Sequence, residues 1–288
     1  MSKKPLRKGK YKVLNWPEYN KALKNRGDLT IWFSEEGIGK WFEEDDKDKK
    51  PGRQREYGDE AIKTMYIIRQ VFNLRLRQTE GFVESILKIM KLALPVPDYT
   101  TLARRARGLN IDFVVNKAKG AINLILDSTG IKVVGEKEWN NHKHGGPRER
   151  NIWRKLHIGV TDDGNIVAGE VTTLRGSDIA TVPDLLKQTT TQIDRVVGDS
   201  PYYEKRMEEP MNGNDNTKDA KFVGTPGNGD KNYGNRLKVE ETFSRYKRII
   251  GNTFKAKHFE GKKNEAKLSL LILNMMQNIG MPFTVRVA

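Results

Sequence analysis

RKLHIGVTDDGNIVAGEVTT (residues 154–173) is the stretch that decides the fold. Two apolar segments flank Asp162-Asp163-Gly164-Asn165, and the Asp-Gly pair at their junction is typical of a tight hairpin turn. Apolar segments of this length, separated by such a turn, predict two antiparallel strands. The middle of the chain is therefore expected to contain a β-hairpin, and the other elements are assigned outward from it.

Further apolar runs on both sides extend the sheet. INLILD (122–127) and IKVVGE (131–136) precede the hairpin, and DRVVGD (194–199) and AKFVG (220–224) follow it. Helical patterns alternate with the later strands, at residues 178–188, 233–251 and 266–280. Several strands in a run, followed by alternating helices and strands, indicate a mixed sheet with covering helices. We therefore predict an α/β fold built on a mixed five-stranded sheet.

The N-terminal part of the chain has helical patterns only. Residues 1–12 are rich in lysine and are expected either to lack fixed structure or to follow DNA. Residues 43–56 are charged and broken by Pro and Gly, which predicts a linker. Helices are expected at 15–27, from the cap Ser34 to near Phe42, at 59–74, from Thr79 to 90, and from the cap Asp98 to 107. We place the boundary between this helical region (1–120) and the sheet domain (121–288) where the patterns change.

The last two of these helices resemble a helix-turn-helix over residues 77–107. In that arrangement the second helix enters the major groove, and its basic residues Arg104, Arg105 and Arg107 would face DNA. The alternative is an ordinary three-helix bundle with a solvated basic face. The sequence leaves both interpretations open.

The overall charge favours a polyanionic partner. The chain has a formal net charge of +15 and a pI of about 9.7, and residues 231–263 carry ten Lys or Arg against three acidic residues. An anionic membrane surface could also attract such charge, but no apolar run reaches the ~18 residues of a membrane span. No signal segment follows the basic N-terminus, so we expect a cytoplasmic protein. The absence of cysteine excludes disulfides and thiolate chemistry.

Two apolar runs end at an aspartate, Asp127 in the first and Asp199 in the second. An aspartate in this position is often a turn residue or a helix cap. Together with Glu240 on a later helix, however, they form a set of three carboxylates, which would repel one another at close range. Divalent metal ions resolve such repulsion. Mg²⁺ prefers oxygen ligands, and paired ions clamp the attacking and leaving oxygens of a phosphodiester.

The segment YGNRLKVEETFSRYKRIIG (residues 233–251) has the spacing Tyr-x2-Arg-x3-Glu-x6-Lys. Its four polar members are Tyr233, Arg236, Glu240 and Lys247. A helix turns by about 100° per residue, so these side chains share an arc of about 60°. That face suits a metal ion with phosphates around it, and a solvated stripe of ion pairs is the alternative. Glu241 lies off this stripe, so Glu240 is the preferred third carboxylate.

Three histidines were also considered as a zinc site. His142 and His144 lie in a Gly-rich basic loop and His157 lies in a strand, without any cysteine to complete a typical set of ligands. The loop around the first two mixes cations with Trp139 and Trp153, which is typical of either DNA contact or core packing.

With these segments, the chain resembles a bacterial insertion-sequence transposase of the Asp-Asp-Glu type, in particular the insertion-sequence-five group. The helical stripe matches that family's Tyr-Arg-Glu-Lys signature at full spacing, LDSTGIKV matches the segment around the first Asp, and VVGDS matches the second. NWPEYNKALKNRGDLTIW, LPVPDYTTLARRAR and WRKLHIGV also fit, so the resemblance covers residues 13–282. It implies a ribonuclease-H-like fold, in which the strands that carry Asp127 and Asp199 lie side by side.

The resemblance also implies a function and residue roles. The catalytic metal ligands would be Asp127, Asp199 and Glu240, and the contacts to transposon-end DNA would be Tyr233, Arg236 and Lys247. The cofactor would be Mg²⁺, with Mn²⁺ as a substitute. The implied activity is phosphodiester hydrolysis at the element ends, followed by strand transfer. The implied partners are duplex DNA with terminal inverted repeats, target DNA, and a second copy of the chain in a homodimer.

The stretch after the second aspartate departs from the family. Gly198-Asp199-Ser200-Pro201-Tyr202-Tyr203 stands where relatives usually have Gly-Asp-Gly-Ala-Tyr-Asp, and the interval to Glu240 is shorter than expected. Two alternatives therefore stay open. One is an inactive or repurposed DNA-binding protein derived from such a transposase, and the other is a structure-selective nuclease that performs no strand transfer.

Overall fold

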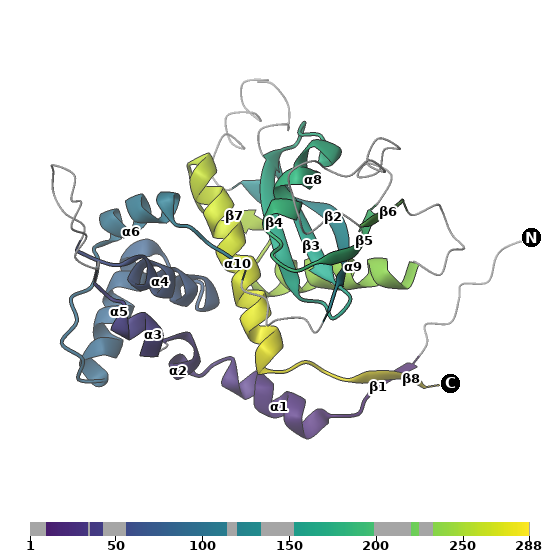
Figure 1. Ribbon diagram of the computed structural model, residues 1–288. Coiled ribbons are helices and arrows are strands. Elements are labelled where there is room, and N and C mark those ends of the chain that lie inside the picture. The colour runs from purple at the N-terminus through teal and green to yellow at the C-terminus, as the bar shows by residue number, and fades with distance from the viewer. Residues whose placement is uncertain are drawn as a thin grey trace, which may run out of the picture.

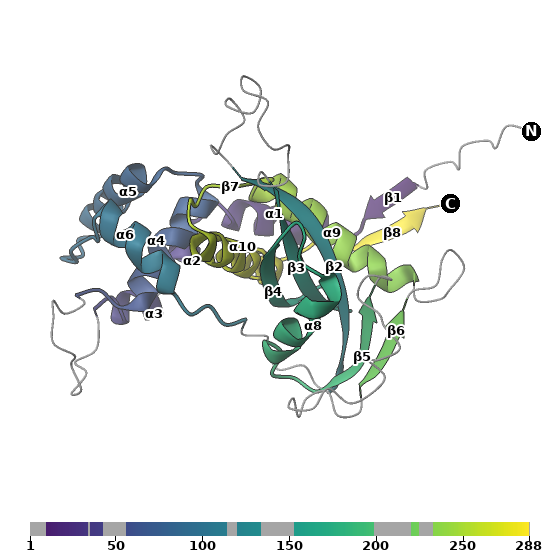
Figure 2. The ribbon, with the colours of Figure 1, turned by 90° about the horizontal axis from the view of Figure 1, so that it is seen from above.

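A computed structural model of the 288-residue chain has a helical region on one side and a sheet with covering helices on the other (Figures 1 and 2). It describes residues 10–33, 35–42, 56–113, 120–133, 153–198, 220–224 and 233–287. Ser34, Asp199, His142 and His144 lie outside these ranges, and so does most of the predicted linker. Within the described ranges, no helix has the length and apolar character needed to cross a membrane.

The N-terminal region is helical, as predicted. Its helices are α1 (Trp16–Asn25), α2 (Leu29–Trp32), α3 (Glu35–Gly39), α4 (Asp59–Val71), α5 (Leu76–Ile89), α6 (Tyr99–Arg105) and the short 3-10 helix η1 (Ala106–Gly108). The predicted cap of α6 is confirmed, because the Asp98 carboxylate accepts hydrogen bonds from the backbone N–H groups of Thr100 and Thr101. Buried residues of α4, including Ile62, Met65 and Ile68, form the centre of this region's core.

The predicted start of α5 was wrong. The helix begins at Leu76, not at Thr79. The backbone N–H of Arg75 donates to the Gln78 side chain at 3.0 Å. This hydrogen bond caps the helix at Arg75, so the helix starts before Thr79. Thr79 is buried inside the helix, where its hydroxyl donates to the Arg75 carbonyl at 3.0 Å. A threonine of this kind resembles a cap in the sequence but bonds one turn back.

The sheet domain has the predicted mixed α/β fold. Its strands are β2 (Ile122–Val133), β3 (Trp153–Thr161), β4 (Ile166–Thr173), β5 (Ile193–Gly198) and β6 (Lys221–Gly224). Their order in the sheet is β4-β3-β2-β5-β6. β3 runs antiparallel to both of its neighbours, β2 and β4, whereas β5 and β6 run parallel to β2. The strand order agrees with a ribonuclease-H-like fold. We predicted that the first strand and the strand that leads to Asp199 lie side by side, and the pairing of β2 with β5 confirms this prediction.

The segments INLILD and IKVVGE were predicted to form two strands, and this prediction was wrong. β2 is one continuous strand, and Asp127 lies near its middle and not at its end. The polar residues Ser128, Thr129 and Gly130 interrupt the apolar pattern, but each of them is paired with a residue of β3. Backbone pairing therefore carries the strand through a segment in which the side-chain pattern ends.

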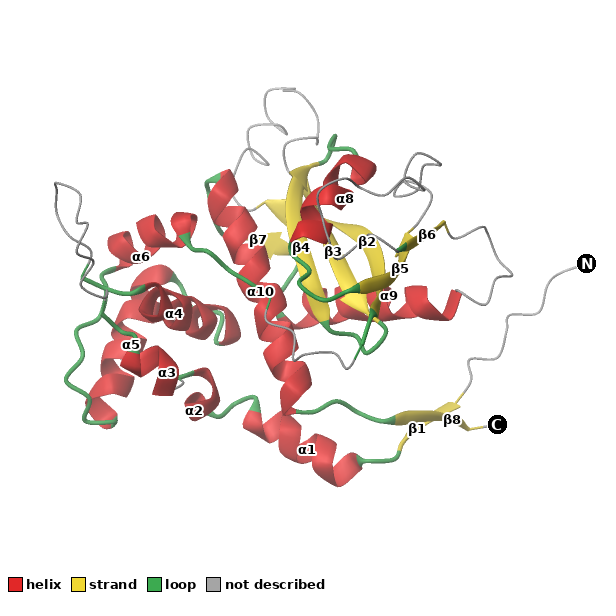
Figure 3. Ribbon diagram, in the orientation of Figure 1, coloured by secondary structure: helices red, strands yellow, loops and turns green. Residues whose placement is uncertain are grey.

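Helices cover both faces of the sheet (Figure 3). They are α8 (Asp178–Lys187), α9 (Tyr233–Ile249) and α10 (Phe259–Ile279). On one face, Val182, Leu185 and Leu186 of α8 pack on Leu124 and Leu126. On the other face, Val239 and Phe243 of α9 and Leu270 and Leu273 of α10 pack on Ile125, Ile131 and Ile158. The odd-numbered residues of β2 thus face α9 and α10, while the even-numbered ones face α8.

The C-terminal segment joins the two regions. Leu268, Ile272 and Met276 of α10 belong to the core of the helical region, while other residues of the same helix pack on the sheet. A further pairing was not predicted, because we expected residues 1–12 either to lack fixed structure or to follow DNA. β1 (Lys10–Val13) pairs antiparallel with β8 (Thr284–Val287), at the two ends of the chain. The boundary at residue 120 stays a prediction.

Candidate active site

Asp127 lies on the face of the sheet that α9 covers. Side chains alternate along a strand, so Asp127 points to the same side as Ile125 and Ile131, which pack against Phe243 of α9. The residue is half-buried, and its Oδ1 accepts a hydrogen bond from the backbone N–H of Ser128 at 2.7 Å. This arrangement holds one carboxylate in the centre of the sheet, beneath a helix that carries further charged residues.

The neighbouring strand β5 leads to the second predicted aspartate. β5 runs parallel to β2, and Gly198 is paired with Leu126, the residue before Asp127. Val196 and Val197 are buried, which fixes the strand between β2 and β6. Asp199 follows Gly198 in the sequence and lies outside the described residues. The part of β5 that is described therefore ends beside the first carboxylate.

One helix, α9, covers all four positions of the Tyr-Arg-Glu-Lys signature. Val239, Phe243 and Tyr246 form its buried face, and burial strongly raises the pKa of the Tyr246 phenol. Glu240 is exposed and follows the fully buried Val239, so it lies beside the line along which the helix meets the sheet. The side chains of Tyr233 and Arg236 lie outside the described part of this helix.

Lys247 joins the helix to the strand that carries Asp127. Its ammonium group donates to the Thr129 hydroxyl at 2.7 Å, two residues along β2 from Asp127 and on the same face. Thr129 was not among the residues predicted for the site, although its distance of two residues from Asp127 was a usable signal. An exposed cation is thereby held on the sheet face near the carboxylate.

The direction of α9 orients Glu240 relative to Asp127. The short strand β7 (Thr253–Phe254) follows α9 and is paired with Lys132 and Val133, at the C-terminal end of β2. The helix therefore ends near that end of β2, and its earlier residues lie toward the middle of the strand and beyond (Figure 2). Glu240 is two turns before Lys247, about 10 Å along the helix axis. Going back along the helix from Lys247 to Glu240 therefore leads from the level of Thr129 toward the level of Asp127.

The three arginines expected to face DNA differ in their surroundings. Arg105 donates to Asp59 and to the Tyr57 carbonyl, both at 2.7 Å, and its side chain is only 10% exposed. That geometry ties α6 to the start of α4 and turns the guanidinium into the protein. Arg104 and Arg107 are exposed. The connection between α5 and α6 spans residues 90–98, which is longer than the turn of a typical helix-turn-helix.

His157 belongs to a closed polar cluster on the opposite face of the sheet. It is fully buried, and its Nε2 lies 2.8 Å from the Thr172 hydroxyl. Asp178 of α8 pairs with Lys155 at 2.6 Å and lies 3.9 Å from His157 Nδ1. Burial lowers the pKa of His157 to about 4, which keeps the imidazole neutral. Since these partners are a hydroxyl, a carboxylate and an ammonium, the cluster is structural.

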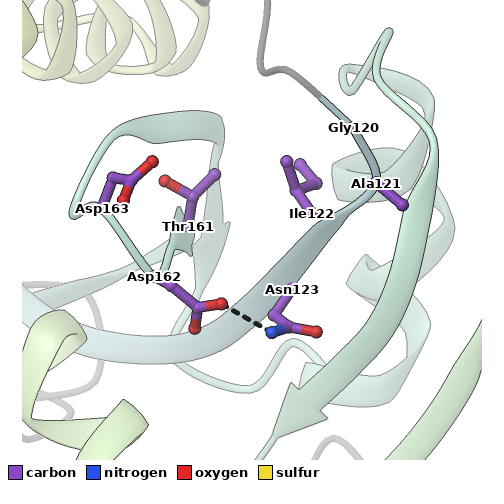
Figure 4. A pocket seen from close by; sticks show the side chains of 7 residues that line it. All are labelled: Gly120, Ala121, Ile122, Asn123, Thr161, Asp162 and Asp163. Atoms are coloured by element: carbon purple, nitrogen blue, oxygen red, sulfur yellow. Dashed lines mark hydrogen bonds between the residues drawn. The ribbon is translucent and has the colours of Figure 1, made fainter.

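A small hollow lies at the N-terminal end of β2. It has a volume of about 230 Å³ and lies between Gly120, Asn123 and the β3–β4 turn (Figure 4). The Asn123 amide donates to Asp162 at 2.6 Å, and Gly164 closes the predicted hairpin turn with a φ of +79°. Asp162 and Asp163 are therefore turn residues, as the sequence indicated. Among the described residues, no group of three His, Asp or Glu side chains could hold a metal ion.

The strand order and the covering helices are consistent with a ribonuclease-H-like domain. Comparison with protein families agrees. Residues 119–275 match the sequence model of a family described as Transposase DDE domain, and residues 24–136 match a second family with the same description. The first match covers more than half of the chain, so the protein belongs to the DDE transposase domain family. Domains of this family are catalytic, bind DNA and generally use divalent metal ions.

Proposed function

We propose that this protein is the DNA transposase of an insertion sequence, of the insertion-sequence-five group. It cleaves phosphodiester bonds at the ends of the element and joins the freed ends to target DNA, acting as a homodimer that holds two ends. The observation that supports this most directly is the position of Asp127, which lies in the centre of the sheet on the face covered by α9.

The pairing of β2 with β5 supports the proposed set of carboxylates. Gly198, which precedes Asp199 in the sequence, is paired with Leu126, which precedes Asp127. Two carboxylates that are 72 positions apart in the sequence thus follow adjacent residues of neighbouring strands. Glu240 is carried by the helix that covers the same face. We propose that these three residues are the catalytic set.

The donor atoms fit a divalent metal ion. Carboxylate oxygens are the ligands that Mg²⁺ and Mn²⁺ prefer, and the hydrogen bond from the Ser128 N–H to Asp127 Oδ1 fixes the orientation of one carboxylate. We propose that Asp127, Asp199 and Glu240 hold the ions. When bound, the metal activates water and stabilises the charge that develops on the phosphate. The residues of the chain orient the phosphodiester and neutralise the negative charges of the phosphates next to it.

Cations around this face would bind the DNA. Lys247 is exposed, and its bond to Thr129 directs the ammonium toward the sheet face that carries Asp127. Arg236 and Tyr233 lie earlier on the same helix, at the spacing of the family signature. In the helical region we propose Arg104 and Arg107 as DNA contacts, because both are exposed, and we leave Arg105 out because its guanidinium is bound by Asp59.

A cleavage assay on the element's own end DNA tests this function. The wild type should nick the DNA at the end in Mg²⁺ or Mn²⁺, and Asp127→Ala, Asp199→Ala and Glu240→Ala should each abolish nicking while DNA binding is kept. Asp163→Ala is the matched control, since this aspartate lies in the exposed β3–β4 turn. Nicking by any of the three variants at the wild-type rate would remove that residue from the catalytic set.

The same assay separates the alternatives. The departure from the family after Asp199 favours a DNA-binding protein that has lost activity, and that protein would bind end DNA but leave it intact in either metal. A nuclease would cut without joining. Transfer of the cut ends to a target plasmid is the result that identifies a transposase.

A further inference from the structure

A second group of cations lies where the helical region meets the segment after β7. Its members come from four places in the chain: Arg69 in α4, Arg75 before α5, Arg107 in η1 and Lys255 after β7. The ammonium of Lys255 donates to the Asn73 side chain, and Asn73 lies in the turn between Arg69 and Arg75. Figure 2 shows the segment after β7 between the sheet and the helical region. Cations of both regions are thereby brought to one place.

Arg69 is the unusual member of this group. It is only 6% exposed, and its Nε is buried without a hydrogen-bond partner among the described residues. Its guanidinium lies over the ring of Tyr66, 5.3 Å from the centroid. A buried cation is normally paired with an acid, because removing it from water is costly.

Among the described residues, one acid of this neighbourhood accepts hydrogen bonds from the backbone. Glu265 of α10 is buried, and its carboxylate accepts the backbone N–H of Lys255 at 2.9 Å and that of Ala256 at 2.7 Å. It therefore fixes the segment after β7. Burial lowers the pKa of the Lys255 ammonium, the positive charges of Arg69 and Arg75 lower it further, and the Glu265 carboxylate acts in the opposite direction. The group is a site of repulsion between like charges, which a bound anion would relieve.

Arg107 approaches the same place from the other side. η1 is held against α10 by the Asn264 side chain, which donates to the Ala106 carbonyl at 2.8 Å. Burial raises the pKa of the Tyr66 phenol, the Glu265 carboxylate raises it further, and the charges of Arg69 and Arg107 lower it. Arg107 itself is exposed, which leaves the group open to solvent on this side.

We propose that Arg69, Arg75, Arg107 and Lys255 form a second DNA contact, which binds one backbone phosphate of a duplex outside the cleavage site. Guanidinium groups match the geometry of phosphate oxygens, and the elements that carry them span the junction between the two regions. DNA bound here would contact the helical region and the sheet domain together. The inference rests on the proposed function in one respect, namely that the ligand is duplex DNA.

The test uses the full chain and a random-sequence duplex, in EDTA so that no cleavage can occur. Fluorescence anisotropy measures the affinity of the wild type, Arg75→Gln, Lys255→Gln and the double variant over a series of salt concentrations. Each single variant should bind more weakly, with a salt slope reduced by at most about 0.9, the value for one phosphate contact. Because both side chains act on the same phosphate, the double variant should also lose no more than about 0.9.

Lys187→Gln is the matched control, because Lys187 lies on α8, on the other face of the sheet, with a side chain that is 72% exposed. Its salt slope should equal that of the wild type. Wild-type slopes in both single variants would overturn the site, and so would a double variant that loses about 1.8, the value for two separate contacts. Arg69→Gln is informative if its circular dichroism is that of the wild type, and the variants of Arg75 and Lys255 keep the test valid if it does not fold.

Inorganic phosphate distinguishes the source of the ligand. Calorimetry at constant ionic strength should show no saturable binding of millimolar phosphate to the wild type. Binding that is present in the wild type and lost in the double variant would assign the site to free phosphate, and would overturn the DNA contact. Because these measurements omit metal, a loss of cleavage cannot imitate their result, and an inactive protein could still confirm the site.

Discussion

The two faces of the central sheet both carry polar side chains, but the surroundings of these side chains differ. On the α8 face, Lys155 pairs with Asp178 at 2.6 Å and His157 bonds to Thr172 at 2.8 Å. On the α9 face, Lys247 bonds to Thr129 at 2.7 Å in an exposed contact, beside the half-buried Asp127. The first face is closed and its charges neutralise one another. On the second, Lys247 and Glu240 are exposed at the edge of the covering helix, so a substrate can reach them.

The comparison shows that burial decides what a polar cluster can do. Asp178 is 9% exposed and His157 is fully buried, so replacing either should change stability. Glu240 and Lys247 are exposed, and their replacement should change DNA processing with little effect on folding. Four measurements follow from this contrast, beginning with the largest expected effect.

Replacing Asp127 by Asn should separate activity from stability. Asn keeps the oxygen that accepts the Ser128 N–H but loses the negative charge. We expect cleavage of end DNA in Mg²⁺ to fall on the order of 10³-fold, because a charge at the reacting centre is lost. The midpoint of urea unfolding should stay within error of the wild type. A variant that cleaves normally, or that unfolds at much lower urea, would place Asp127 with the structural residues.

Replacing Asp178 by Asn should have the opposite effect. The Lys155 ammonium would keep its partly buried position without a counter-charge, at a cost of about 2 kcal/mol in the free energy of unfolding, less than for a fully buried pair. Asp184→Asn, on the same helix, breaks an exposed pair with Lys187 at 3.8 Å and should cost less than about 0.5 kcal/mol. Equal urea midpoints for the two variants would show that the α8 face is not closed.

The pH dependence of stability should report the same cluster. Burial lowers the pKa of His157 to about 4 in the folded protein, against about 6.5 in the unfolded chain, so the unfolded state binds more protons between these values. Stability from this residue is complete above pH 6.5 and is lost as the pH falls toward 4. We expect a loss of about 2 kcal/mol between pH 7.5 and pH 5.

Urea unfolding at a series of pH values measures this loss. His157→Gln serves as the comparison, since it cannot take up the proton and should remove this part of the slope. If the wild type and His157→Gln showed the same dependence on pH over this range, the imidazole would not be the group that titrates.

The smallest effect is expected at Thr129. Thr129→Val removes the acceptor of the Lys247 ammonium, and we expect a change of about 1 kcal/mol or less, equivalent to about fivefold in cleavage rate. Thr129→Ser keeps the hydroxyl and should behave as the wild type. A loss of stability with no change in cleavage would show that the bond only fastens α9 to the sheet.

Much of the fold could be predicted from local patterns. The hairpin at residues 162–165 and the cap Asp98 were expected from such patterns and are present, whereas the position of β5 beside β2 was expected from the fold that the family resemblance implies. The errors occurred where distant segments pair. β2 continues through Ser128, Thr129 and Gly130 because β3 supplies partners for their backbones, and β1 exists because β8 lies beside it. No pattern within a single segment contains that information.

The candidate site divides in the same way. The sequence assigned Asp127, Glu240 and Lys247 from run ends and helical spacing, and the structure places Asp127 and Lys247 around one face of β2, with Glu240 on the helix that covers it. Roles for these residues and for Asp199 stay predictions. Arg105 was included with the DNA contacts because the sequence shows a basic helix but does not show that Asp59, far earlier in the chain, binds this arginine.

The sequence by itself determined which residues share a helix face and where most of the strands lie, because both depend on the periodicity of neighbouring residues. Only the tertiary structure decided which charges are neutralised. Arg105 meets Asp59, whereas the Nε of Arg69 is buried without a hydrogen-bond partner among the described residues and Glu265 is held by backbone N–H groups. The physical reason is that the energy of a charge depends on the groups and the solvent around it, and folding alone brings those groups together.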